Sequence, residues 1–236
     1  MAKRKAEAFM SVGEQAAGIT FFLIYLFVLP FATGPIFRFA AQVTGKTLTA
    51  SMRDMIYYYV LFAATIVIFH GYLARTTRKL GENFALSLKT LAMGLVALYG
   101  LNELVYRLTH ALVNNRTNLN NVSISAQIHA SPRLTLLIVI FLAPFVEETL
   151  FRGLIFGNLK TRSRVLAYVI SCLLFALLHV WQFAVVQRDM TYFLLMVQYL
   201  VPGLVLAWAY DHSGTLWTAI GLHAAANALS VWSLWK

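Results

Sequence analysis

The sequence predicts an all-α fold, a polytopic membrane bundle of about seven transmembrane helices. Of its 236 residues, 60% are hydrophobic and only 12% are charged, and the mean hydropathy is +0.70. A soluble domain usually carries about 25% charged residues. The apolar residues also fall in runs long enough for about 20 helical residues to cross about 30 Å of hydrocarbon. Together these observations exclude a soluble protein.

The predicted membrane spans follow one another along the chain. Pro30 and Pro35 are expected to break the far end of the first span. A polar, Asn-rich loop is expected at 107–131, between the third and fourth spans. No internal repeat and no soluble domain is evident, so we expect a single helical bundle. The predicted spans are 18–39, 54–74, 84–106, 132–159, 164–183, 190–210 and 214–235.

The net charge of +10 is explained by membrane topology rather than by a nucleic-acid partner. Lys and Arg gather at the ends of apolar runs, where they orient helices and meet anionic lipid headgroups. If the spans alternate, the basic clusters at 3–5, 75–79 and 160–164 share one side, which predicts a cytoplasmic N-terminus. We expect a multi-pass protein of a prokaryotic plasma membrane, in contact with membrane lipids and without nucleic acid.

Three charged residues lie inside the apolar fourth span: Glu147, Glu148 and Arg152. Charges in hydrocarbon are expensive, and those that are kept usually mark a pathway or a reaction site. Glu148 and Arg152 are four residues apart and therefore share a helix face, where they can pair. Glu147 is rotated from Glu148 by about 100°. The two carboxylates should therefore have different roles.

Two later spans each carry a pair of residues at helical spacing. Phe175 and His179 form one pair, and His223 and Asn227 form the other. Residues four apart lie on one helix face, and counting along the helices places both pairs within the bilayer. Glu, His, His and Asn converging inside a membrane indicate hydrolysis more than ion conduction.

These three motifs, in this order on separate spans, resemble the signatures of the CAAX protease and bacteriocin-processing family, also called the ABI family of intramembrane proteases. The family includes the type II CAAX prenyl endopeptidases. The resemblance covers the last four predicted spans, which we expect to form a catalytic core at 132–236. The region 1–131, with about three spans and the Asn-rich loop, is expected to vary in such families. The implied substrate is a membrane-associated peptide or protein.

The resemblance also implies a role for each motif residue. Glu147 and His179 would activate the attacking water. His223 and Asn227 would stabilise the oxyanion of the tetrahedral intermediate. The ion pair of the fourth span would support the site. This inventory agrees with peptide hydrolysis, which needs a base for water, a proton for the leaving amine and donors for the oxyanion.

Several alternatives stay open at this level. Glu147, His179 and His223 also make a His₂Glu set typical of catalytic zinc, although the Asn beside one His favours a metal-free oxyanion hole. Phe175 is either a wall of the substrate groove or core packing. Buried acids and histidines also occur in proton- or ion-coupled transporters. A third class is a non-catalytic membrane immunity or assembly factor that keeps the motifs for its fold.

Overall fold

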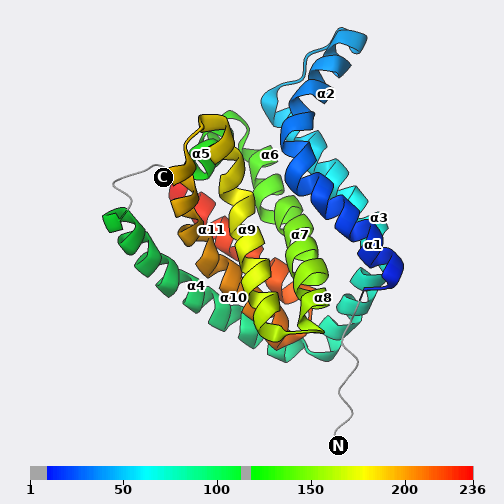
Figure 1. The fold of residues 1–236 in the computed structure, drawn as a ribbon, viewed down its shortest axis with the longest axis vertical. Helices are drawn as coiled ribbons and strands as arrows, with labels where there is room; N and C mark the ends of the chain where they lie inside the picture. Colours follow the sequence, from blue (N-terminus) through cyan, green and yellow to red (C-terminus); the bar gives the residue numbers. More distant parts are fainter. Residues whose placement is uncertain (1–9, 113–117, 236) are drawn as a thin grey trace, which may run out of the picture.

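The structure of the protein, a computed structural model, describes residues 10–112 and 118–235 (Figure 1). Every regular element in these two ranges is helical, which confirms the all-α prediction. Within them, six helices are long and apolar enough to cross a membrane, in agreement with about seven predicted spans. The last predicted span corresponds to α11, which is not one of the six.

The elements follow in chain order, with π-helical or 3₁₀ turns labelled η. They are α1 (Val12–Leu23), η1 (Ile24–Val28), α2 (Leu29–Thr44), α3 (Ala50–Glu82), α4 (Phe84–Leu112), α5 (Leu119–Ala130), α6 (Pro132–Leu137), η2 (Ile138–Leu142), α7 (Ala143–Glu148), η3 (Thr149–Phe156), α8 (Gly157–Lys160), α9 (Arg164–Gln187), η4 (Met190–Met196), α10 (Val197–Ser213) and α11 (Leu216–Trp235).

The first span is longer than predicted, because neither proline ends it. The helix runs from Val12 to Thr44. Pro30 lies in the first turn of α2, directly after the π-helical η1, and Pro35 lies inside α2. A missing backbone N–H is tolerated in a first helical turn. The span ends instead at Gly45, whose φ of 66° is the left-handed conformation typical of a glycine that stops a helix.

The first span is fastened to the rest of the bundle near its N-terminus. Phe69 of α3 leaves the helical conformation, with φ −108° and ψ 18°. Near this kink, the backbone N–H of Tyr72 donates to the buried Glu14 carboxylate of α1 over 2.5 Å. Gly18 faces the Phe69 ring so closely that an added Cβ would lie 2.7 Å from it and 3.1 Å from Leu154 of η3. This close approach seats α1 on the helix that carries the acidic motif.

The predicted Asn-rich loop at 107–131 is wrong for most of its length. α4 continues to Leu112, and α5 covers Leu119–Ala130. Asn118 caps α5, because its Oδ1 accepts hydrogen bonds from the N–H groups of Asn120 and Asn121. Asn is a preferred helix N-cap as well as a loop residue. Asn-rich composition alone therefore does not distinguish a loop from a capped short helix.

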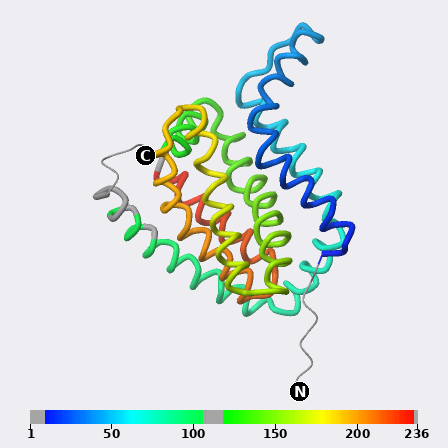
Figure 2. Tube along the Cα trace, viewed as in Figure 1, coloured from blue at the N-terminus to red at the C-terminus, as the bar shows by residue number. Residues whose placement is uncertain are grey.

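The fourth span, Pro132–Lys160, is the central helix of the bundle. In its most apolar stretch 72% of the residues are buried, whereas the share is 33% or less in the other five candidate spans. Figure 2 shows this span, α9, α10 and α11 side by side, with α4 crossing them at one edge. Ser171 of α9 donates a hydrogen bond to the carbonyl of Phe151 over 2.9 Å. Because of its central position, this span contacts the helices that carry the other residues of the candidate site.

Candidate active site

Glu147 and Glu148 lie between two π-helical turns of the fourth span, and Arg152 lies within the second of them. In η2 the N–H of Ala143 reaches back five residues to the carbonyl of Ile138. Pro144 follows and has no N–H to offer to the carbonyl of Val139. Asn227 of α11 supplies the donor instead, with its Nδ2 2.8 Å from that oxygen. The proline therefore frees a carbonyl that binds the last helix.

The predicted pair of Glu148 and Arg152 is present, and it is part of a larger buried cluster. Glu148 Oε1 accepts from Arg152 over 3.0 Å and from Nδ1 of His223 over 2.8 Å. Arg152 also donates to the carbonyl of Gly203 over 3.0 Å, and its guanidinium lies 4.4 Å from the centre of the Phe175 ring. Both charged side chains are fully buried. Removing either charge would leave the other without its ionic partner.

Hydrogen bonds fix which ring nitrogen each histidine presents to the site. A carbonyl or carboxylate oxygen can only accept, so Nδ1 of His223 donates to Glu148, and Nδ1 of His179 donates to the carbonyl of Phe175 over 2.8 Å. Nε2 of both rings remains for the site. In His179 it lies 4.0 Å from Oε2 of Glu147. That carboxylate oxygen is buried and has no hydrogen-bond partner among residues 10–112 and 118–235.

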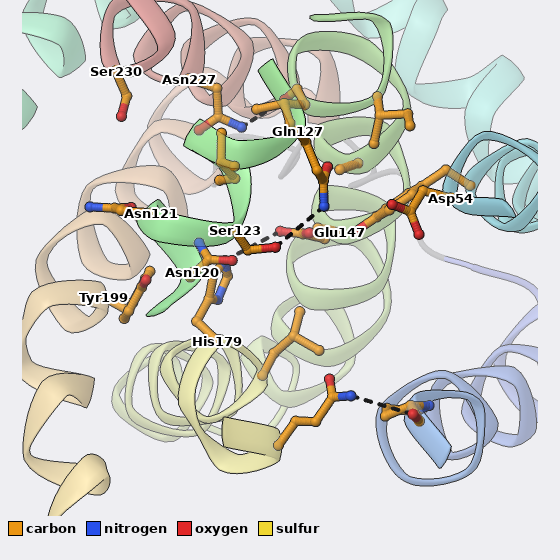
Figure 3. Close-up of a pocket in the computed structure, with 18 of the residues that line it drawn as sticks. Asp54, Asn120, Asn121, Ser123, Gln127, Glu147, His179, Tyr199, Asn227 and Ser230 are labelled. Atoms are coloured by element: carbon orange, nitrogen blue, oxygen red, sulfur yellow. Dashed lines mark hydrogen bonds and ion pairs between the residues drawn. The ribbon is translucent and has the colours of Figure 1, made fainter. Parts of the chain in front are cut away.

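A cavity of about 600 Å³ contains this meeting point. It is lined by Phe175 and by all four residues predicted to be catalytic, Glu147, His179, His223 and Asn227. Figure 3 shows Glu147 and His179 directed toward each other within it. Glu148 and Arg152 do not line the cavity. The arrangement thus separates a reactive group of side chains from a buried ion pair behind it.

The cavity occupies one half of the bundle. From α3 only the first turns contribute, Arg53 to Tyr58, and from α11 only the later turns, His223 to Val231. Side chains of α5 line it as well. The cavity thus lies in the half of the bundle where α5 lies, opposite the turn between α8 and α9 (Figure 1).

The comparison with known families concerns the part of the chain that builds this site. Residues 129–229 match the model of the family described as type II CAAX prenyl endopeptidase Rce1-like. This part of the chain, called here the Rce1-like segment, is similar to that family. No curated protein and no solved structure matches the chain. The match contains all three motifs, and its family supports a CAAX-type membrane protease.

The Rce1-like segment contains one contact to the site that the sequence did not reveal. The ring of Tyr199, at the start of α10, stacks on the imidazole of His179 with centroids 4.4 Å apart and planes at 22°. Its hydroxyl exchanges hydrogen bonds with Asn118, which caps α5. No motif spacing links Tyr199 to His179, since the two residues lie on different helices.

Polar residues of α5, outside the three motifs, were also missed. Their side chains line the cavity opposite the acidic motif, as Figure 3 shows. Asp54 of α3 lines the cavity too and is half-buried. The Asn-rich composition of this segment is the signal that could have found them, had it been interpreted as a capped helix. The residues on α5 are Asn120, Asn121, Ser123 and Gln127.

The zinc alternative was tested on the positions of its ligands. Among residues 10–112 and 118–235, no three His, Cys, Asp or Glu side chains are grouped so as to hold one metal ion. Glu147, His179 and His223 therefore do not form, in this arrangement, the three-ligand set that catalytic zinc requires. The side chains of the Rce1-like segment do not fit a zinc site as they stand.

Proposed function

We propose that this protein is an intramembrane endopeptidase that hydrolyses a peptide bond of a membrane-associated protein or peptide. The observation that carries the proposal is the buried Oε2 of Glu147, which accepts no hydrogen bond from the described residues and faces Nε2 of His179 across 4.0 Å in the cavity. A buried acid without a cation has little structural reason to exist in a membrane helix. The Rce1-like match of residues 129–229 supports the same reaction class.

Glu147 and His179 are proposed to activate the attacking water. Their separation of 4.0 Å is longer than a direct hydrogen bond but suits a water that contacts both groups. Glu147 takes a proton from the water as its oxygen attacks the scissile carbonyl carbon. The proton then passes to the nitrogen of the leaving amine as the C–N bond breaks. General bases of this kind contribute about 10²- to 10⁴-fold to rate.

His223 and Asn227 are proposed to stabilise the oxyanion. Because Nδ1 of His223 donates to Glu148, Nε2 is the ring atom left for the oxyanion, and it donates when both ring nitrogens carry hydrogen. Asn227 uses one N–H on the carbonyl of Val139 and retains a second. Removing one such donor typically costs about 10²- to 10³-fold in kcat.

The test is turnover by the purified protein in lipid nanodiscs. The probes are quenched fluorescent peptides ending in a Cys-aliphatic-aliphatic-X sequence, each with and without a farnesyl group. Glu147→Gln and His179→Ala should each lower kcat at least about 100-fold without changing the folded yield. Glu103→Gln is the matched control, because that exposed carboxylate lies outside the cavity and pairs with Arg107 on the same helix. Intact turnover in both site variants would reject the proposal.

We also propose that the reaction needs no metal. The support is the donor set, since the acid and the two histidines are not gathered around one point and an Asn accompanies His223. Dialysis against a zinc chelator should leave turnover unchanged, with the metal content of the dialysed protein measured in parallel. Loss of turnover that returns on adding zinc would establish the zinc alternative.

A further inference from the structure

The face of α5 that lines the cavity carries four uncharged polar side chains and the apolar Ile124. Three carboxamides and one hydroxyl line the cavity: Asn120, Asn121, Ser123 and Gln127. Ser125, on the same helix, does not line the cavity. Carboxamides and hydroxyls each carry both hydrogen-bond donors and acceptors. This face can therefore offer hydrogen bonds to a polar occupant.

These side chains use only part of their hydrogen-bonding capacity within the chain, and Asn120 interacts with the hydroxyl of Tyr199. Gln127 Nε2 donates to Ser123 Oγ over 3.3 Å, which leaves Gln127 Oε1 and a second N–H available. No described residue makes a hydrogen bond to the carboxamide of Asn121. Asn118, by contrast, is fully used in holding α5 to Gln198 and Tyr199 of α10. The helix is thus anchored, while its cavity face keeps donors and acceptors.

The peptide that reaches Glu147 has the complementary need. A scissile bond must be extended to admit the attacking water, and a peptide unwound inside a membrane loses its own helical hydrogen bonds. Each of its backbone groups then needs a donor or acceptor other than water. A carboxamide side chain carries the same donor and acceptor pair as a peptide group.

The spacing of the polar side chains along α5 also matches the spacing of main-chain groups in an extended peptide. Ser123 and Gln127 are four residues apart, so they are separated by about 6 Å along the helix axis. Successive same-side groups of an extended chain are about 6.6 Å apart. Ser123 and Gln127 can therefore each form a hydrogen bond to main-chain groups two residues apart in an extended peptide.

We propose that this face of α5 binds the backbone of the substrate in extended conformation beside the scissile bond. The inference rests on the proposed endopeptidase function and adds the form in which the substrate is bound. Its ligand class is an extended peptide segment recognised through main-chain groups. Because these contacts involve only main-chain groups of the substrate, they tolerate substrates of different sequence.

The test compares Gln127→Met and Ser123→Ala with the matched control Ser125→Ala. Gln127→Met keeps length and volume but removes the amide. The probe is the farnesylated quenched peptide, together with a series of analogues in which one backbone N–H at a time is replaced by an ester oxygen. Gln127→Met should lower kcat/KM for the all-amide peptide about tenfold, and Ser125→Ala should not. For one ester analogue, Gln127→Met and the wild type should have equal kcat/KM.

Peptide binding, measured by fluorescence anisotropy in the same nanodiscs, separates this inference from the proposed function. Weaker binding in Gln127→Met supports the inference whether or not the peptide is cleaved. Turnover that depends on Glu147 but is unchanged in both Gln127→Met and Ser123→Ala overturns the inference and leaves the protease proposal standing. The inference is also overturned if all variants bind the peptide equally well, or if no variant binds it.

Discussion

At the residue scale, two adjacent carboxylates have different surroundings. Glu148 accepts from Arg152 and from His223 and is fully buried. Glu147 is buried too, but it lines the cavity, where its Oε2 lies 4.0 Å from Nε2 of His179 and accepts no hydrogen bond from the described residues. One step along a helix turns a side chain by about 100°, which suffices to send one acid into an ion pair and the other to a reaction site.

Glu148 should therefore matter for stability and Glu147 for rate. Glu148→Ala leaves the guanidinium of Arg152 buried without its carboxylate, which typically costs about 3–5 kcal/mol. Thermal unfolding in detergent should show a clear drop in Tm for Glu148→Ala. Glu147→Gln serves as the control and should unfold near the wild-type temperature while losing turnover. Equal unfolding temperatures for the wild type and Glu148→Ala would contradict the structural role.

Tyr199 should act as a positioning residue for His179. Tyr199→Leu removes the ring that stacks on the imidazole and should lower kcat about tenfold with little change in KM, since aromatic pairs contribute about 0.5–1.5 kcal/mol. Tyr199→Phe keeps the ring and should recover most of the loss. The measurement is kcat and KM on the farnesylated peptide. If the Phe variant is as slow as the Leu variant, the stacking interaction is not what orients His179.

At the element scale, the fourth span is held by neighbours on several sides. α1 approaches it through Gly18, and α11 reaches it through Asn227. The acidic motif is thus positioned by contacts from both ends of the sequence. Spacing along a single helix could predict the Glu148–Arg152 pair, whereas it could not predict these contacts between helices.

Gly18 tests the fit of α1 against this span. A Cβ at Gly18 would meet the Phe69 ring at 2.7 Å, so Gly18→Ala should destabilise the protein by about 1–3 kcal/mol. Gly13→Ala is the matched control, because nothing lies within 4 Å of the added carbon. Thermal unfolding of the two variants provides the comparison. A Tm for Gly18→Ala equal to that of Gly13→Ala would show that α1 can shift to accept the methyl group.

How far the sequence could predict the molecule differs between its levels. Apolar runs indicated the spans, and i, i+4 spacing indicated the motif faces, because both depend on local geometry. Pro30 was misread because a π-helical turn precedes it, and such turns have no clear sequence signature. α5 was misread because Asn favours both loops and caps. Tyr199 was missed because its contact with His179 joins two helices.

At the whole-molecule scale, the two ends of the bundle differ in character. The cavity and α5 lie at one end, and the turn between α8 and α9, with its basic residues, lies at the other. The positive-inside rule places the basic turns in the cytoplasm. The predicted orientation would therefore place the cavity in the half of the bundle away from the cytoplasm.

Single-cysteine labelling checks this orientation independently of activity. Cys172 is buried and is the chain's one cysteine, so Cys172→Ala provides a background. Thr161→Cys, in the turn after α8, and His129→Cys, in α5, are both at exposed positions. With a membrane-impermeant maleimide, intact bacterial cells expressing the protein should label His129→Cys, and Thr161→Cys should label only after permeabilisation. The reverse pattern would place the N-terminus outside the cell.

The π-helical turns of the fourth span limit which insertions and deletions this segment can tolerate. The carbonyl of Val139 in η2 binds Asn227, and the carbonyl of Phe151 in η3 binds Ser171. Deleting one residue from either turn would rotate everything beyond it by about 100° relative to everything before it. Such a deletion would move Glu147 away from Asn227 or from His179, although the span would remain as hydrophobic as before. The length of this segment, as much as its residues, is therefore under constraint.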